Sequence, residues 1–121
     1  MTAATILIVE GEEQVRRLLK HVLARAGYNV EAASEPAEAI GICRGRSIDL
    51  VLADAGWMRP NGHDLAWWLA VELSATRVLL MAAWESECED CAYVSRCEVI
   101  RKPFDVKEVL ASVAAILARP W

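Results

Sequence analysis

The sequence lacks any long run of apolar residues, although 55% of its side chains are hydrophobic. Its longest uncharged apolar stretch, residues 78–84, is far shorter than the ~18 residues that indicate a membrane-spanning helix. Residues 1–20 carry acidic side chains where a secretory signal peptide would be apolar. We therefore expect no membrane insertion and a cytoplasmic location.

Basic residues are not clustered either. The 13 lysines and arginines are scattered over several segments, are outnumbered by 17 acidic residues, and leave a formal net charge of -4. A nucleic-acid-binding domain commonly gathers its positive charge on one face or along one stripe. Direct binding of nucleic acid by this chain is therefore not expected.

Histidine is scarce, and this bears on the four cysteines. Cys88, Cys91 and Cys97 form a C-x2-C-x5-C pattern, and closely spaced thiolates are typical zinc ligands. No histidine lies nearby to complete the four ligands of a structural site, and Cys88 and Cys91 also fit one face of a short helix as small hydrophobic residues. Packing is the stronger interpretation, and in a reducing compartment these residues and Cys43 are expected to stay thiols.

The length of 121 residues and the 25% of charged residues predict a single domain over residues 1–121. Residues 5–9 (TILIV) are a continuous aliphatic run, typical of a strand buried on both faces of a parallel sheet. Further strands are predicted at residues 28–33, nearer the sheet edge, and at residues 48–53, 78–81 and 98–100. Helices are predicted at residues 13–26, 36–45, 63–73, 85–95 and 106–117. This alternation predicts parallel strands with helices on both faces.

The first predicted helix has an apolar stripe with the i, i+3, i+4, i+7 spacing of an amphipathic helix. The stripe consists of Val15, Leu18, Leu19, Val22, Leu23 and Ala26. The same spacing predicts that the basic residues face outward, namely Arg16, Arg17, Lys20 and Arg25. Gly27 is a stop signal for this helix.

Charged residues follow several predicted strands at their carboxyl ends, where open α/β sheets bind ligands. Glu10, Gly11 and Glu12 follow the first strand, Asp54 follows the third, and Lys102 follows the fifth. Each acid alone fits a solvated loop residue equally well, but their joint placement favours a site. Carboxylates gathered at one edge repel one another, and a hard cation or a basic side chain relieves that repulsion. The pattern therefore predicts Mg2+ beside Lys102.

Five stretches carry a more specific signal: ILIVEGEE (6–13), DLVLAD (49–54), PNGHDLA (60–66), VLLMAA (78–83) and RKPFD (101–105). In this order and spacing the chain resembles the receiver domain of bacterial two-component response regulators over nearly its whole length. The resemblance implies a flavodoxin-like (βα)5 fold, a three-layer α/β sandwich with a parallel five-stranded sheet of order 2-1-3-4-5. It also implies a signalling module and not an enzyme.

The resemblance also implies roles for individual residues. Asp54 matches the phosphoacceptor, which receives a phosphoryl group from a histidine kinase or a phosphotransfer protein. Lys102 matches the lysine that contacts the phosphoacceptor and its phosphoryl group. Mg2+ would be held by Asp54, by Glu10 and by the backbone carbonyl of Gly56, and Glu12 is a further candidate ligand. A divalent cation and a lysine suit phosphoryl transfer because they neutralise its equatorial oxygens.

Three positions depart from the family's pattern. Gly11 stands where the family has an acidic metal ligand, so Mg2+ binding is expected to be weak. Ala82 stands at the phosphate-binding position of a threonine or serine whose hydroxyl closes onto the phosphoryl group. Losing such a hydrogen bond, worth ~1.5 to 3 kcal/mol, weakens a two-state switch roughly 10- to 150-fold. Val99 replaces the aromatic switch residue, and with Pro103 and Phe104 it matches part of the family's interaction face.

Two functions therefore stay open. In the first, Asp54 accepts a phosphoryl group and a conformational change passes to a downstream protein partner or output domain. The contact face would be built from residues 85–95, 98–100 and 106–117. In the second, the chain is a degenerate receiver that binds a partner through the same face without phosphorylation. The retained Asp54 favours the first function, and the three altered positions favour the second.

Overall fold

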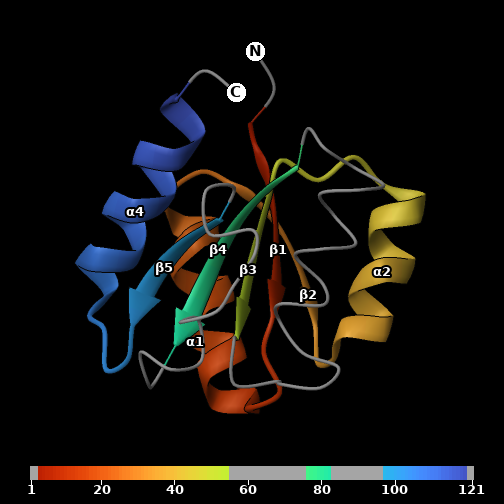
Figure 1. Cartoon of the computed structure of the whole chain (residues 1–121), viewed down its shortest axis with the longest axis horizontal. Coiled ribbons are helices and arrows are strands. Elements are labelled where there is room, and N and C mark those ends of the chain that lie inside the picture. Colours follow the sequence, from red (N-terminus) through yellow and green to blue (C-terminus); the bar gives the residue numbers. More distant parts are fainter. Residues whose placement is uncertain (1–2, 55–75, 83–96, 120–121) are drawn as a thin grey trace.

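The sheet is five-stranded and entirely parallel. A computed structural model of the protein describes residues 3–54, 76–82 and 97–119 (Figure 1). The strands are β1 (Thr5–Val9), β2 (Asn29–Ala33), β3 (Leu50–Asp54), β4 (Arg77–Ala82) and β5 (Cys97–Arg101). They lie in the order β2-β1-β3-β4-β5, and every neighbouring pair is parallel. The predicted order 2-1-3-4-5 and the edge position of residues 28–33 are confirmed.

Helices cover both faces of this sheet and make three layers (Figure 1). They are α1 (Glu13–Arg25), α2 (Pro36–Gly45) and α4 (Val106–Ala118). The helices α1 and α4 pack on one face, and α2 packs on the other. The helices predicted at residues 63–73 and 85–95 lie outside the described residues. Among the described helices, none is long and apolar enough to span a membrane.

The end of α1 confirms Gly27 as a stop signal. Gly27 has a φ of +102°, a left-handed conformation that glycine adopts without steric cost. Its amide donates to the carbonyl of Ala24 at 3.1 Å, and the amide of Tyr28 donates to the carbonyl of Leu23 at 3.2 Å. This pair of bonds is the Schellman motif, which satisfies the last helical carbonyls. The chain is thereby turned from α1 directly into β2.

The positions at which α2 and α4 begin are also explained by individual residues. Pro36 occupies the first turn of α2, where its missing N–H costs nothing. Asp105 is the N-cap of α4, and its Oδ1 accepts a hydrogen bond from the amide of Glu108 at 2.8 Å. This cap explains why α4 begins at Val106, as predicted.

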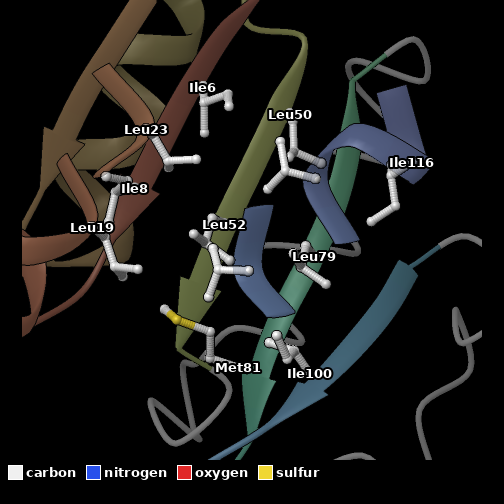
Figure 2. Packing of buried hydrophobic residues seen from close by; sticks show 12 residues of the cluster. Ile6, Ile8, Leu19, Leu23, Leu50, Leu52, Leu79, Met81, Ile100 and Ile116 are labelled. Atoms are coloured by element: carbon white, nitrogen blue, oxygen red, sulfur yellow. The ribbon is translucent and has the colours of Figure 1, made fainter. Parts of the chain in front are cut away.

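Alternate residues of the central strands enter two separate hydrophobic cores, as the period of two in a strand requires. The core under α1 and α4 is shown in Figure 2 and includes Ile6, Ile8, Leu19, Leu23, Leu50, Leu52, Leu79, Met81, Ile100 and Ile116. The core under α2 includes Leu7, Val9, Ala39, Cys43, Val51, Ala53, Val78 and Leu80. Because β1 and β3 are buried on both faces, their sequences read as continuous apolar runs.

The predicted apolar stripe of α1 was wrong at Leu18, which is 50% exposed, and at Ala26, which is also exposed. Leu19 and Leu23 are fully buried against the sheet and occupy the narrow line of contact between helix and strands. Leu18 precedes Leu19 by one residue and is therefore turned by about 100° around the helix, away from that line. A helix packed on this sheet buries a narrower stripe than its apolar residues alone suggest.

Candidate functional site

The register of the parallel strands brings the predicted site residues to one edge of the sheet. Val9 of β1 pairs with Ala53 of β3, so the residues that follow them, Glu10 and Asp54, lie beside each other. Ala82 ends β4 and pairs with Arg101, the residue before Lys102. We call Glu10, Asp54, Ala82 and Lys102 the carboxyl-end rim.

Lys102 forms ion pairs with both carboxylates of the rim. Its Nζ lies 3.2 Å from Oδ2 of Asp54 and 3.9 Å from Oε2 of Glu10. The side chain of Glu10 is only 3% exposed and that of Asp54 16%, whereas Lys102 retains 29% exposure. Ion pairs that are partly withdrawn from water are screened less than surface pairs. The predicted convergence of two acids and one lysine is therefore present in the fold.

Glu10 is the most deeply buried acid of the site. Its Oε1 accepts a hydrogen bond from the backbone amide of Glu12 at 3.2 Å, whereas its Oε2 has no hydrogen-bond partner within the described part of the chain. Burial raises the pKa of Glu10 above its ordinary value, and the neighbouring Asp54 carboxylate raises it further. The Glu12 amide and the Lys102 ammonium oppose this shift. A second positive charge beside Oε2 would stabilise the ionised form.

The position of Arg16 differs from the predicted one. The spacing predicts an outward side chain, but the Arg16 guanidinium turns back over the chain between β1 and α1. Its Nη1 donates to the backbone carbonyl of Glu10 at 2.9 Å and lies 3.4 Å from that of Gly11. Periodicity indicates the helix face of Arg16 but not the reach of its long side chain, so these contacts could not be predicted from the sequence.

The donor set fits a divalent cation with few protein ligands. Glu10 and Asp54 supply carboxylate oxygens, and Oε2 of Glu10 is buried without a hydrogen bond from any described residue. Glu12 is exposed, and the described residues contain no group of three or more His, Cys, Asp or Glu side chains that could hold a metal. Mg2+ usually keeps several waters and takes one or two protein carboxylates, so two acids are sufficient. The third predicted ligand, the carbonyl of Gly56, lies outside the described residues.

The cysteine pattern is only partly within the described structure. Cys88 and Cys91 lie outside the described residues, and Cys97 is the first residue of β5. The predicted choice between packing and zinc at these three positions stays a prediction. The remaining cysteine, Cys43, is buried in the core under α2, where burial raises the pKa of its thiol.

The predicted interaction face is partly apolar and exposed. Val99 of β5 is 39% exposed, and so is Val106 at the start of α4. Pro103 is exposed, whereas Phe104 is half-buried and packs against the core under α1 and α4. Val99 pairs with the fully buried Leu80, but it lies on the edge strand, where fewer neighbours cover it. On this predicted face, the two valines and Pro103 are therefore more exposed than Phe104.

Comparison with known proteins decides the family. The chain matches the response regulator receiver domain family over residues 6–114. The chain belongs to this family. Its assignment to two-component signalling, implied by the five sequence stretches, is thereby confirmed.

Curated and solved relatives agree with this assignment. The phosphate regulon transcriptional regulatory protein PhoB of Pseudomonas aeruginosa is 32% identical over 98% of this chain and 54% of its own length. A response regulator from Thermotoga maritima has a TM-score of 0.85 and 24% identity, covering 97% of this chain and 99% of the other. TrrA of Thermotoga maritima, solved in complex with Mg(2+)-BeF, has a TM-score of 0.82 and 25% identity, covering 93% and 98%.

The receiver domain accounts for only part of its curated relatives. The chain spans about half the length of the transcriptional regulatory proteins that it matches. The fold and the family membership therefore apply to this receiver domain. The activities and partners of the longer proteins are a separate question.

Proposed function

We propose that this receiver domain accepts a phosphoryl group on Asp54 from a histidine kinase or a phosphotransfer protein. The observation that carries the proposal is the 3.2 Å ion pair between Lys102 Nζ and Asp54 Oδ2 at the carboxyl-end rim. It places a cation beside the carboxylate of Asp54, whose side chain retains 16% exposure to solvent. A phosphoryl group arriving at that oxygen would meet a positive charge that needs no rearrangement.

In the proposed step, a carboxylate oxygen of Asp54 attacks the phosphorus of a phosphohistidine. An O–P bond forms, the N–P bond breaks, and the electron pair of that bond stays on the imidazole nitrogen. Lys102 stabilises the charge on the transferred group, because phosphoryl transfer depends mainly on positioning and charge neutralisation. The receiver acts here as the acceptor in a signalling exchange and not as an enzyme with its own substrate turnover.

Mg2+ is the proposed cofactor, and it would neutralise phosphoryl oxygens when bound. Glu10 and Asp54 would hold it, together with the carbonyl of Gly56 by analogy with the family. Support comes from Oε2 of Glu10, which is buried and accepts no hydrogen bond from a described residue, and from TrrA, which was solved with Mg(2+)-BeF. Gly11 supplies no carboxylate, so we propose that binding is weaker than in a receiver with two consecutive acids.

The proposed output is a change passed to a downstream protein partner or output domain. The surface for it contains Val99, Pro103 and Phe104 next to α4. Relatives such as PhoB are transcriptional regulatory proteins about twice as long as this chain, which is consistent with a receiver that controls an attached or separate partner. Because Ala82 has no hydroxyl and Val99 has no ring, the proposed change on phosphorylation is smaller than in other receivers.

A second candidate is a partner-binding domain that needs no phosphorylation. It is favoured by the exposed valines Val99 and Val106 and by the altered positions Gly11 and Ala82. In this case the face formed by β5 and α4 would bind its partner equally well whether or not Asp54 is modified.

Phosphorylation with acetyl phosphate and Mg2+ separates the two candidates. We expect intact mass spectrometry to detect one added phosphoryl group on the unchanged chain and none on Asp54→Asn. Asp105→Asn is the matched control, because asparagine is an equally good helix N-cap and the charge change is the same. Absence of an adduct on the unchanged chain, or an equal adduct on Asp54→Asn, would contradict phosphoryl acceptance and leave the second candidate.

A further inference from the structure

Two neighbouring arginines at the start of α1 make different contacts. Arg17 pairs with Glu13 one turn earlier, at 2.8 Å, and the two side chains are 78% and 61% exposed. Arg16 is partly buried and instead donates from Nη1 to backbone carbonyls, at 2.9 Å to Glu10 and 3.4 Å to Gly11. Exposed i, i+4 pairs contribute little, so Arg17 serves as an internal reference for Arg16.

Arg16 contacts the backbone of the connection between β1 and α1. Residues 10–12 join β1 to α1, and glycine at position 11 leaves the backbone freer than any other residue would. The amide of Glu10 donates to the carbonyl of Ala33 at 3.0 Å, which ties the start of this connection to β2. The guanidinium of Arg16 contacts the carbonyls of Glu10 and Gly11, which the helix itself does not use.

The connection that Arg16 contacts also carries the hydrogen bond to the Glu10 carboxylate. Oε1 of Glu10 is tied to the amide of Glu12, which leaves Oε2 without a hydrogen bond among the described residues and 3.9 Å from Lys102 Nζ. If residues 10–12 moved, the Glu12 amide would move with them. Oε1 would then lose its partner, and Oε2 would no longer be directed toward Lys102.

We propose that Arg16 is a positioning residue that fixes the Glu10–Gly11 backbone, so that Glu10 Oε2, which accepts no hydrogen bond from a described residue, is directed toward a divalent cation shared with Asp54. This inference rests on the proposed function, because it assigns a role toward the cation of that same site. Arg16 does not touch the cation. It acts on Glu10 through the backbone, as residues that orient metal ligands do.

The direction in which Mg2+ affinity changes when Arg16 is replaced distinguishes a positioning role from a purely electrostatic one. A guanidinium near the rim repels a cation, so removing its charge without disturbing Glu10 would strengthen Mg2+ binding. Loss of positioning would weaken binding instead, because the carboxylate would be poorly directed. Arg16→Met and Arg17→Met each remove one positive charge from the same turn of α1, and only Arg16→Met removes the contacts with the carbonyls.

The experiment is a calorimetric Mg2+ titration of the unchanged chain, Arg16→Met, Arg16→Lys and Arg17→Met, without a phosphoryl donor. We expect Arg16→Met to bind Mg2+ about 10-fold more weakly, since loss of a group that orients a metal ligand commonly costs 10- to 100-fold. Arg17→Met should stay within about 2-fold of the unchanged chain. Arg16→Lys should fall between the two, because it keeps a charged donor but not the planar guanidinium.

Equal or tighter Mg2+ binding by Arg16→Met overturns the proposal, as does an equal loss in Arg17→Met or the absence of Mg2+ binding by the unchanged chain. If Arg16→Met does not fold, Arg16→Lys decides alone, and binding as tight as in the unchanged chain overturns the proposal. The proposed function fails separately. A chain with Arg16-dependent Mg2+ binding and no phosphoryl adduct on Asp54 would retain this inference and lose phosphoryl acceptance.

Discussion

Lys102 lies closer to Asp54 than to Glu10, with its Nζ 3.2 Å from one carboxylate and 3.9 Å from the other. One ammonium group therefore serves two acids, and only the nearer one is within hydrogen-bonding distance. The negative charge of the buried Glu10 is therefore less well neutralised by Lys102 than that of Asp54. A second cation would stabilise Glu10 more than Asp54.

Replacing Lys102 by methionine should slow phosphorylation by acetyl phosphate by about 10- to 150-fold, the effect of losing a charged hydrogen bond of ~1.5 to 3 kcal/mol. Lys102→Arg keeps the charge and should retain more activity. Lys107→Met, which alters an exposed lysine on α4, is the control. Rates from a time course of intact mass give the comparison, and equal rates for Lys102→Met and the unchanged chain would rule out this role.

Substitution of Gly11 by aspartate should raise Mg2+ affinity by at least about 10-fold, because ligand number and charge set the affinity of such sites. Among the described glycines, Gly27 has a positive φ and Gly11 does not. Aspartate at position 11 therefore needs no left-handed backbone conformation. Gly11→Asn has nearly the same size without the charge and should show a smaller gain. Calorimetric titration measures all three chains. No gain in Gly11→Asp would mean that another group already fills the position.

Glu10→Gln should make the metal-free protein more stable at pH 8, because it removes a buried charge whose pKa is raised by burial. The sign follows from linkage, since a carboxyl that binds its proton more tightly when folded loses stability as the pH rises through its folded-state pKa. The advantage of Glu10→Gln should therefore shrink as the pH falls toward 4.

Urea unfolding at several pH values measures that difference. Saturating Mg2+ should reverse the order, because the cation stabilises the folded, ionised Glu10 and has no comparable partner in Glu10→Gln. A difference between the two chains that does not change with pH would contradict a raised pKa at Glu10.

Arg77 binds the end of α4 from the start of β4. Its guanidinium donates to the carbonyls of Ile116 at 2.8 Å and Leu117 at 2.9 Å, and also to that of Arg119. The last turn of α4 has no basic residue of its own, so Arg77 supplies the positive charge that a helix C-terminus favours.

Arg77→Met should lower the free energy of unfolding by about 1 to 2 kcal/mol, because several terminal carbonyls lose a charged donor. The exposed control Lys107→Met should change it by less than about 0.5 kcal/mol. Urea unfolding measures both, and hydrogen exchange of the last turn of α4 should accelerate in Arg77→Met alone. Equal stability of the two variants would show that the contacts contribute nothing.

Much of the fold could be predicted because its signals are local. The run TILIV predicts a strand buried on both faces, the 3.6-residue spacing after Glu13 predicts α1, and Gly27 marks the end of that helix. Parallel strands must end at one edge, so Glu10, Asp54 and Lys102 could be assigned to a single site before any distance was known. Gly11 could be identified as the missing acid because the resemblance to receivers locates each rim position.

Side chains whose contacts depend on residues far away in the sequence, or on how a long side chain bends, could not be predicted in this way. The helical spacing predicts that Arg16 faces outward. That spacing gives the direction in which the side chain leaves the helix, but not that its guanidinium bends back to the carbonyl of Glu10. Leu18 fits the apolar stripe and is nevertheless exposed, because only the curvature and breadth of the contact with the sheet determine how much of a stripe is covered.

The sequence by itself therefore determined the order of the strands and helices and the chemical types gathered at the rim, because hydrophobic spacing and turn residues act over a few neighbouring positions. Only the tertiary structure decided the distances from Lys102 to the two carboxylates, which oxygen of Glu10 accepts no hydrogen bond from a described residue, and which arginine contacts the backbone of Glu10 and Gly11. These are distances between side chains carried by separate strands and helices, and packing of the whole domain is what determines them.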